Sequence, residues 1–124
     1  MSENCDIFVH DLSFLCWVWV RMGISIPQLA VLTALYRLGE AEAYEIAATT
    51  GLSKSNLYRQ LDYLESKDAV ELAGRRKDWH RQEVKVWRLT LCGKRTVRAY
   101  ERLYRKHCAD ELHRLRVSNG KEKI

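Results

Sequence analysis

The sequence predicts a mainly α-helical fold with one small β-hairpin, built as a single domain over residues 1–124. Apolar residues recur every three or four positions in five segments, which is the spacing of amphipathic helices. Another segment has two short apolar stretches around a polar, glycine-containing loop, which is typical of a hairpin. The chain is 47% hydrophobic with one Pro and six Gly, so collagen-like, low-complexity and wholly disordered classes are excluded.

The first helix is expected over residues 6–22 and would end at Gly23. It is apolar almost all round, and such a helix would leave a large apolar surface exposed on a small monomer. We therefore expect it to be a dimerisation helix, with a second copy of the chain covering Phe8, Leu12, Leu15 and Trp19.

The second helix has clear boundary signals. Ser25 is suited to cap its start, Pro27 lies in the first turn where a missing N–H costs little, and Gly39 would end it. Between these residues, leucines at helical spacing form the next apolar stripe. This helix should therefore contribute to the core.

Two short helices are predicted on either side of Gly51. The first covers about residues 41–49, and Gly51 can take the left-handed conformation that commonly ends a helix. Ser53 can then cap a helix over about residues 54–67. Its inward face would carry Leu57, Leu61 and Leu64, which leaves the other face polar.

A hairpin is predicted from strands at residues 70–73 and 84–90, joined by the strongly basic loop 74–82. Either Trp87 with Leu89 or Val84 with Val86 could face the core, because a shift of one residue exchanges the two faces of a strand. We favour Trp87 with Leu89.

The last helix is expected over residues 92–117, followed by a flexible polar tail at 118–124. Its apolar seam is about five turns long and exceeds the surface that a small domain offers to cover it. We expect this seam to be a second part of the dimer interface, through Tyr100, Tyr104, Leu112 and Leu115.

Charge is divided unevenly along the chain. Residues 1–52 hold two basic and six acidic side chains, whereas residues 53–124 hold 19 basic and 10 acidic ones. Clustered Lys and Arg favour a polyanion partner, above all a phosphate backbone. Two alternatives remain: the basic residues could bind the headgroups of a membrane, or they could simply face solvent without a partner.

The compartment is expected to be the cytoplasm. The N-terminus is acidic and lacks the pattern of a secretory signal, and the apolar run at residues 14–20 is too short for a membrane span of ~20 residues. The four cysteines form no C-x-x-C pair, so reduced thiols are expected. We therefore predict no membrane association.

The helices on either side of Gly51 have the spacing of a helix-turn-helix. Ala47 lies four residues before Gly51, where a small side chain lets the helices approach, and Leu57 lies six after it, where an apolar one anchors the second helix. A helix that projects in this way fits the ~12 Å major groove of B-DNA. Gln60 stands where an apolar residue is usual. This favours a winged helix-turn-helix, with residues 24–92 as its core and the basic hairpin as its wing.

Four pieces of sequence occur in one order: IPQLAVL at residues 26–32, EIA at 45–47 with GLSKSNL at 51–57, LDYLE at 61–65 and LTLCG at 89–93. Together they resemble the MarR family of winged-helix transcription regulators over roughly residues 24–95. The chain departs from the family pattern in two places: Asp78 is separated from Arg81 by two residues in the hairpin loop, and residues 67–70 lack the usual Gly before the first strand. The resemblance implies regulation of transcription but not by itself a small-molecule effector.

Direct contacts with DNA are expected from the polar helix face and from the hairpin. An Arg can bond guanine and an Asn adenine, while hydroxyls reach base edges or phosphate. Basic side chains on the hairpin could follow the backbone or enter the adjacent minor groove. The candidate residues are Lys54, Ser55, Asn56, Tyr58, Arg59, Arg75, Arg76, Lys77 and Arg81.

Two side chains at the loop tip leave alternatives open. Trp79 and His80 could stack on a base or a sugar, or Trp79 could fold back on the strands. The sequence does not decide between them.

No enzyme, metal site or cofactor is predicted. His107 and Glu111 have a four-residue spacing that could place two ligands on one metal ion, but no second ligand pair accompanies them. A structural or interfacial role is therefore favoured. The chain also lacks a glycine-rich phosphate loop and a recognisable nucleophile with its base.

The sequence thus predicts a sequence-specific regulator of transcription that binds double-stranded DNA. We expect a homodimer on a palindromic operator, acting as a repressor. The alternative is a winged-helix module whose basic face docks on an acidic protein partner.

Overall fold

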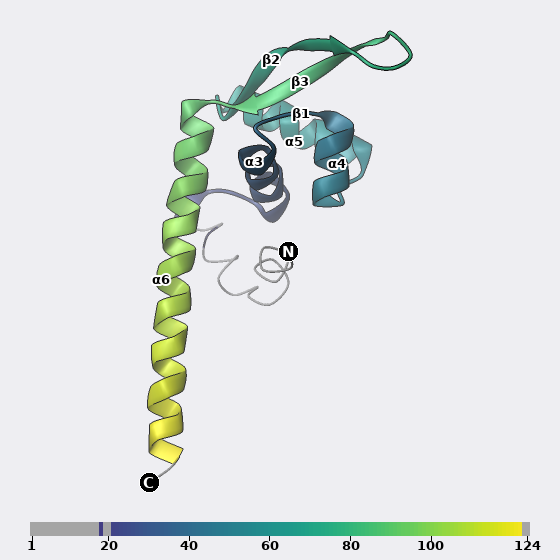
Figure 1. Cartoon of the computed structure of the whole chain (residues 1–124). Coiled ribbons are helices and arrows are strands. Elements are labelled where there is room, and N and C mark those ends of the chain that lie inside the picture. Colours follow the sequence, from purple (N-terminus) through teal and green to yellow (C-terminus); the bar gives the residue numbers. More distant parts are fainter. Residues whose placement is uncertain (1–17, 19–20, 123–124) are drawn as a thin grey trace.

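The computed structural model describes Val18 and residues 21–122. Within this part the elements are α3 (Ile26–Leu38), β1 (Glu40–Glu42), α4 (Ala43–Thr50), α5 (Lys54–Ser66), β2 (Val70–Lys77), β3 (Glu83–Leu89) and α6 (Leu91–Glu122). The described strands form one antiparallel sheet in the order β1-β3-β2. The sheet lies over α3, α4 and α5, while α6 extends away from it (Figure 1). The predicted mainly helical fold with a hairpin is confirmed.

The predicted helix ends are confirmed by their hydrogen bonds. Ser25 Oγ accepts from the backbone N–H of Gln28 at the start of α3. Gly51 adopts φ 77° and ψ 6° after α4 and donates its N–H to a carbonyl of the last turn. Ser53 Oγ then accepts from the backbone N–H at the third position of α5. Each boundary is therefore set by a local signal.

The core lies between the helices and the sheet. Leu57 and Leu61 of α5 are fully buried, together with Ile46 of α4. Trp87 and Leu89 of β3 join the same cluster, so the favoured strand face is confirmed. The neighbouring Val86 is also buried.

A third strand was missed by sequence reasoning. Residues 40–42 are extended, so α4 begins at Ala43 rather than at about residue 41. Ala41 pairs with Trp87 of β3 and is fully buried. Pairing with a distant strand outweighs the helical preference of a Glu-Ala-Glu segment, because β structure depends on its neighbours more than on local propensity.

The hairpin is longer than predicted. β2 continues to Lys77, with an irregularity in its register between Leu72 and Gly74. Arg75, Arg76 and Lys77 therefore stand on a strand, and only residues 78–82 connect β2 to β3. Because strand residues alternate in direction, these three side chains cannot all face the same way.

α6 runs to Glu122, five residues beyond its expected end at residue 117. Tyr100 is only 3% exposed because it packs against Leu29 and Val18 of the same chain, and Tyr104 packs partly against this cluster. Tyr100 is thus part of an intramolecular core already in the single chain, and its place in a dimer interface stays a prediction. Leu112 and Leu115 are exposed in the single chain.

Phe8, Leu12, Leu15 and Trp19 lie outside the described residues. In the described part, no helix combines the length and the apolar character that crossing a bilayer requires.

The start of α6 is held tightly against the start of β2. Thr90 donates its backbone N–H to the carbonyl of Ala69 at 3.0 Å and accepts at its hydroxyl from the N–H of Gly93 at 3.1 Å. A Cβ atom on Gly93 would overlap the Ala69 carbonyl oxygen. Only glycine therefore fits this position without a backbone shift.

We expect Gly93→Ala to lower the free energy of unfolding by about 1–3 kcal/mol, the usual cost of overpacking. Helix propensity alone predicts the opposite sign, since Ala exceeds Gly by ~1 kcal/mol in a helix. Urea unfolding measures the difference. Cys92→Ala, at an exposed neighbour, is the control and should change stability by less than about 0.5 kcal/mol. A stabilised Gly93→Ala protein would contradict the close packing.

Candidate nucleic-acid interface

α5 presents a polar face because its leucines are buried on the other side. Lys54, Ser55, Tyr58 and Arg59 are exposed, as predicted from their spacing relative to Leu57. Serine, tyrosine and arginine side chains in the first turns of an exposed helix can reach base edges. Four of the candidate side chains are thereby brought onto one surface.

Asn56 lies on the edge of this face and is partly buried. Its Oδ1 atom accepts a hydrogen bond of 2.9 Å from Nε2 of Gln60. This bond fixes the orientation of the amide, and the carbonyl oxygen keeps a second lone pair for another donor. Gln60 thus supports a candidate side chain at the position where an apolar residue was expected.

A half-open groove of about 560 Å³ lies between the start of α5, the start of α4 and β3. Lys54 and Tyr58 line it from α5, and Lys85 lines it from β3. The groove places Lys54 and Tyr58 beside the hairpin, as the winged arrangement requires. Lys85 was not among the DNA-contacting residues predicted from the sequence. The sequence does show it as a single basic residue between Val84 and Val86, which places it on the opposite face of the strand from these valines.

The hairpin carries several exposed cations. Arg75 and Lys77 are exposed on β2, and Arg81 is exposed in the connection with φ 62°. Arg75 lies 3.5 Å from Glu83, but both side chains are more than half exposed, so this pair contributes little. These three cations face solvent and can meet a polyanion.

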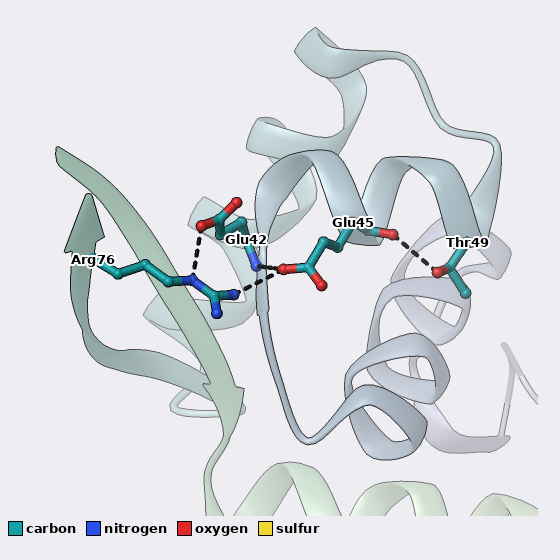
Figure 2. A network of polar contacts seen from close by, with 4 residues as sticks. All are labelled: Glu42, Glu45, Thr49 and Arg76. Carbon is teal, nitrogen blue, oxygen red and sulfur yellow. Dashed lines mark hydrogen bonds and ion pairs between the residues drawn. The ribbon is translucent and has the colours of Figure 1, made fainter. Parts of the chain in front are cut away.

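Arg76 differs from the other predicted hairpin cations. Its Nε lies 2.7 Å from Glu42 Oε1, and its Nη2 lies 2.8 Å from Glu45 Oε1 (Figure 2). The same Glu45 oxygen accepts from the backbone N–H of Glu42. The guanidinium thus ties β2 to the start of α4, and we call these three residues the Arg76 junction. Sequence reasoning assigned Arg76 to DNA alone because its partners are 31 or more positions away.

A second ion-pair cluster lies at the opposite end of the sheet. Arg88 donates from Nε and Nη2 to Glu71 Oε2 at 3.0 and 2.8 Å and lies 3.8 Å from Glu40. The hydrogen bonds and charge of Glu71 raise the pKa of Arg88 above its usual value. Arg88 therefore links β3 to both neighbouring strands.

Trp79 is 88% exposed, and its ring lies against that of His80 with 3.7 Å between centroids. It does not fold back on the strands, which removes one of the two alternatives.

In the described residues, no cluster of three potential metal-binding side chains occurs.

Residues 28–107 match the protein family described as the winged helix DNA-binding domain. No curated protein matches the chain in sequence.

Solved structures show the same fold at low identity. The chain is similar to the YusO protein from Bacillus subtilis, with a TM-score of 0.69 and 20% identity over 98% of this chain and 88% of that one. A MarR variant from E. coli, solved with operator DNA, gives a TM-score of 0.64 and 23% identity over 79% and 68%. BpsR from Bordetella bronchiseptica, whose DNA binding is regulated by 6-hydroxynicotinic acid, gives a TM-score of 0.56 and 18% identity over 70% of this chain and 64% of BpsR. The chain thus spans less than two thirds of BpsR.

The Arg76 junction predicts a measurable coupling. In a double-mutant cycle on urea unfolding, Arg76→Gln and Glu42→Gln should couple by about 1 kcal/mol, because the Glu42 side chain is only 12% exposed. The matched control is the cycle of Arg75→Gln with Glu83→Gln, which should couple by less than about 0.5 kcal/mol. Equal coupling in the two cycles would show that the junction does not hold the hairpin.

Proposed function

The chain belongs to the winged helix DNA-binding domain family, and from this premise we propose that it is a sequence-specific transcriptional regulator of double-stranded DNA. The observation that carries the proposal is the exposed polar face of α5, which lies beside a cationic hairpin across a shared groove. In this proposal α5 enters the major groove and its side chains read base edges. The hairpin cations contact the phosphate backbone next to it.

Individual roles follow from chemistry. Arg59 is proposed to bond guanine and Asn56 adenine, with Ser55 and Tyr58 on base edges or phosphate. Lys54 is proposed to contact phosphate, and exposed hairpin cations extend that contact. This second set comprises Arg75, Lys77, Arg81 and, by its place in the groove, Lys85. Arg76 is proposed to act by holding the hairpin at its angle to α4.

We propose that the regulator is a homodimer. Leu112 and Leu115 of α6 are 56% and 59% exposed. They are three positions apart and therefore lie on one face of the helix. Exposed apolar side chains on one face of a long helix favour a partner helix from a second copy. A two-fold dimer could place two α5 helices in successive major grooves ~34 Å apart, which favours a palindromic site. Sedimentation of 14.6 kDa material alone at micromolar concentration would contradict the dimer.

A dimer seated across an operator blocks other proteins from the same DNA, so repression by occlusion is the regulatory outcome that we propose. We propose the cytoplasm as its place of action, because similar structures come from Bacillus subtilis and E. coli, whose DNA lies in the cytoplasm.

Selection of bound duplexes from a random pool tests the proposal. We expect enrichment of a palindrome with half-sites about one helical turn apart. Enrichment of a single half-site would exclude the dimeric reading. The alternative function, docking on an acidic protein, predicts binding to that protein and no enrichment of any duplex.

Two substitutions should weaken DNA binding in different ways. Arg59→Ala should relax base preference and cost ~1–3 kcal/mol on the selected duplex. Lys77→Ala should weaken all duplexes alike and lower the slope of log affinity against log salt by about one. Fluorescence anisotropy over a salt series measures both quantities.

The matched control is Arg105→Ala, which removes one exposed cation from the middle of α6. It should leave the base preference and the salt slope unchanged. A double variant of Arg59 and Lys77 with unaltered affinity and slope would show that the DNA surface lies elsewhere.

A further inference from the structure

The connection between β2 and β3 is held in one conformation by its own hydrogen bonds. Asp78 Oδ1 accepts from the backbone N–H groups of His80 at 2.8 Å and Gln82 at 2.9 Å. The Asp78 N–H donates to the Gln82 carbonyl, and the Arg81 N–H donates to the Asp78 carbonyl, both at 2.9 Å. Such a connection presents its side chains with little loss of freedom on binding.

The side chain that this connection presents is Trp79. It is 88% exposed, more than any other large hydrophobic residue in the described part of the chain. The His80 ring lies at 3.7 Å with a tilt of 36° and supports one side of the indole. Holding a large aromatic side chain in water is unfavourable, and exposed Trp residues are characteristic of binding surfaces.

We propose that Trp79, supported by His80, binds the sugar and base faces of a DNA minor groove, next to the major groove that α5 enters. This inference rests on the proposed function and adds a contact that does not depend on charge. In Figure 1 the hairpin extends past α4 and α5, with the connection at its far end. Trp79 belongs to this connection, and it is not among the residues that line the groove shared by α5 and β3. It can therefore reach DNA beside that groove.

The chemistry around Trp79 favours DNA over an apolar protein or lipid partner. Lys77 and Arg81 flank the aromatic pair in sequence, and both are exposed. Cations at this place can meet the two phosphate rows that border a minor groove ~6 Å wide, while the flat ring enters between them. Apolar side chains in a minor groove act as wedges that unstack a base step.

A wedge of this kind would confer sequence preference without hydrogen bonds to bases. Pyrimidine–purine steps such as TA open at low cost, whereas A-tracts are stiff. The half-site should therefore extend beyond the bases that α5 reads and include a flexible step at the position of the hairpin tip.

The test compares Trp79→Ala, Trp79→Phe and wild type on the duplex selected from the random pool. We expect Trp79→Ala to weaken binding by about 5- to 100-fold, the range of one lost aromatic–base contact. The salt slope should be unchanged because no phosphate contact is lost. Trp79→Phe should recover most of the affinity. Unchanged urea unfolding of each variant would show that the loss is local.

A second measurement addresses the base step. Replacing a flexible step in the flank by an A-tract should weaken wild-type binding and leave the Trp79→Ala protein almost unaffected. If wild type binds the duplex and Trp79→Ala binds equally well, this inference is wrong while the proposed function stands. A reduced salt slope in Trp79→Ala would also overturn it, because that result indicates a lost phosphate contact. A wild-type protein that binds no duplex would overturn the proposed function itself.

Discussion

Burial of one leucine stripe on α5 determines where the candidate recognition side chains point. Leu57 and Leu61 are fully buried, and Leu64 is 4% exposed. Rotation of the helix would place these side chains in water, and each buried leucine contributes ~1.5–3 kcal/mol. The helix is therefore held with its polar face outward. Gly51 and Ser53 complete the constraint by turning the chain and starting α5 at a fixed angle to α4.

The charges of the hairpin serve two different purposes. Arg76 and Arg88 are paired with carboxylates from neighbouring elements, and the Arg76 pairs join the hairpin to the start of α4. Arg75, Lys77 and Arg81 lie on the exposed surface. The Arg76 junction joins the hairpin to the helix that precedes α5 (Figure 2). The distance between the exposed cations and the α5 face thus depends on a junction that itself need not touch DNA.

Local signals in the sequence predicted the helices well. Ser25, Gly51 and Ser53 define ends through bonds to residues within four positions, so their effect is visible in the sequence. The strand at residues 40–42 could not be found in this way, because its partner is β3, more than 40 positions later. The role of Arg76 was missed for the same reason. Prediction from sequence also has a third limit, which concerns Tyr100. A row of apolar residues on a helix does not reveal whether the same chain or a second copy covers it.

The most direct test of the central claim is a map of the protein surface that DNA contacts. Backbone amide NMR spectra of the labelled protein, recorded with and without the duplex selected from the random pool, provide this map. We expect shifts concentrated on residues 53–60 of α5 and residues 75–85 of the hairpin, with residues 110–117 of α6 unchanged. Shifts confined to α6 or α3, with the α5 face unperturbed, would contradict the assignment of this surface to DNA.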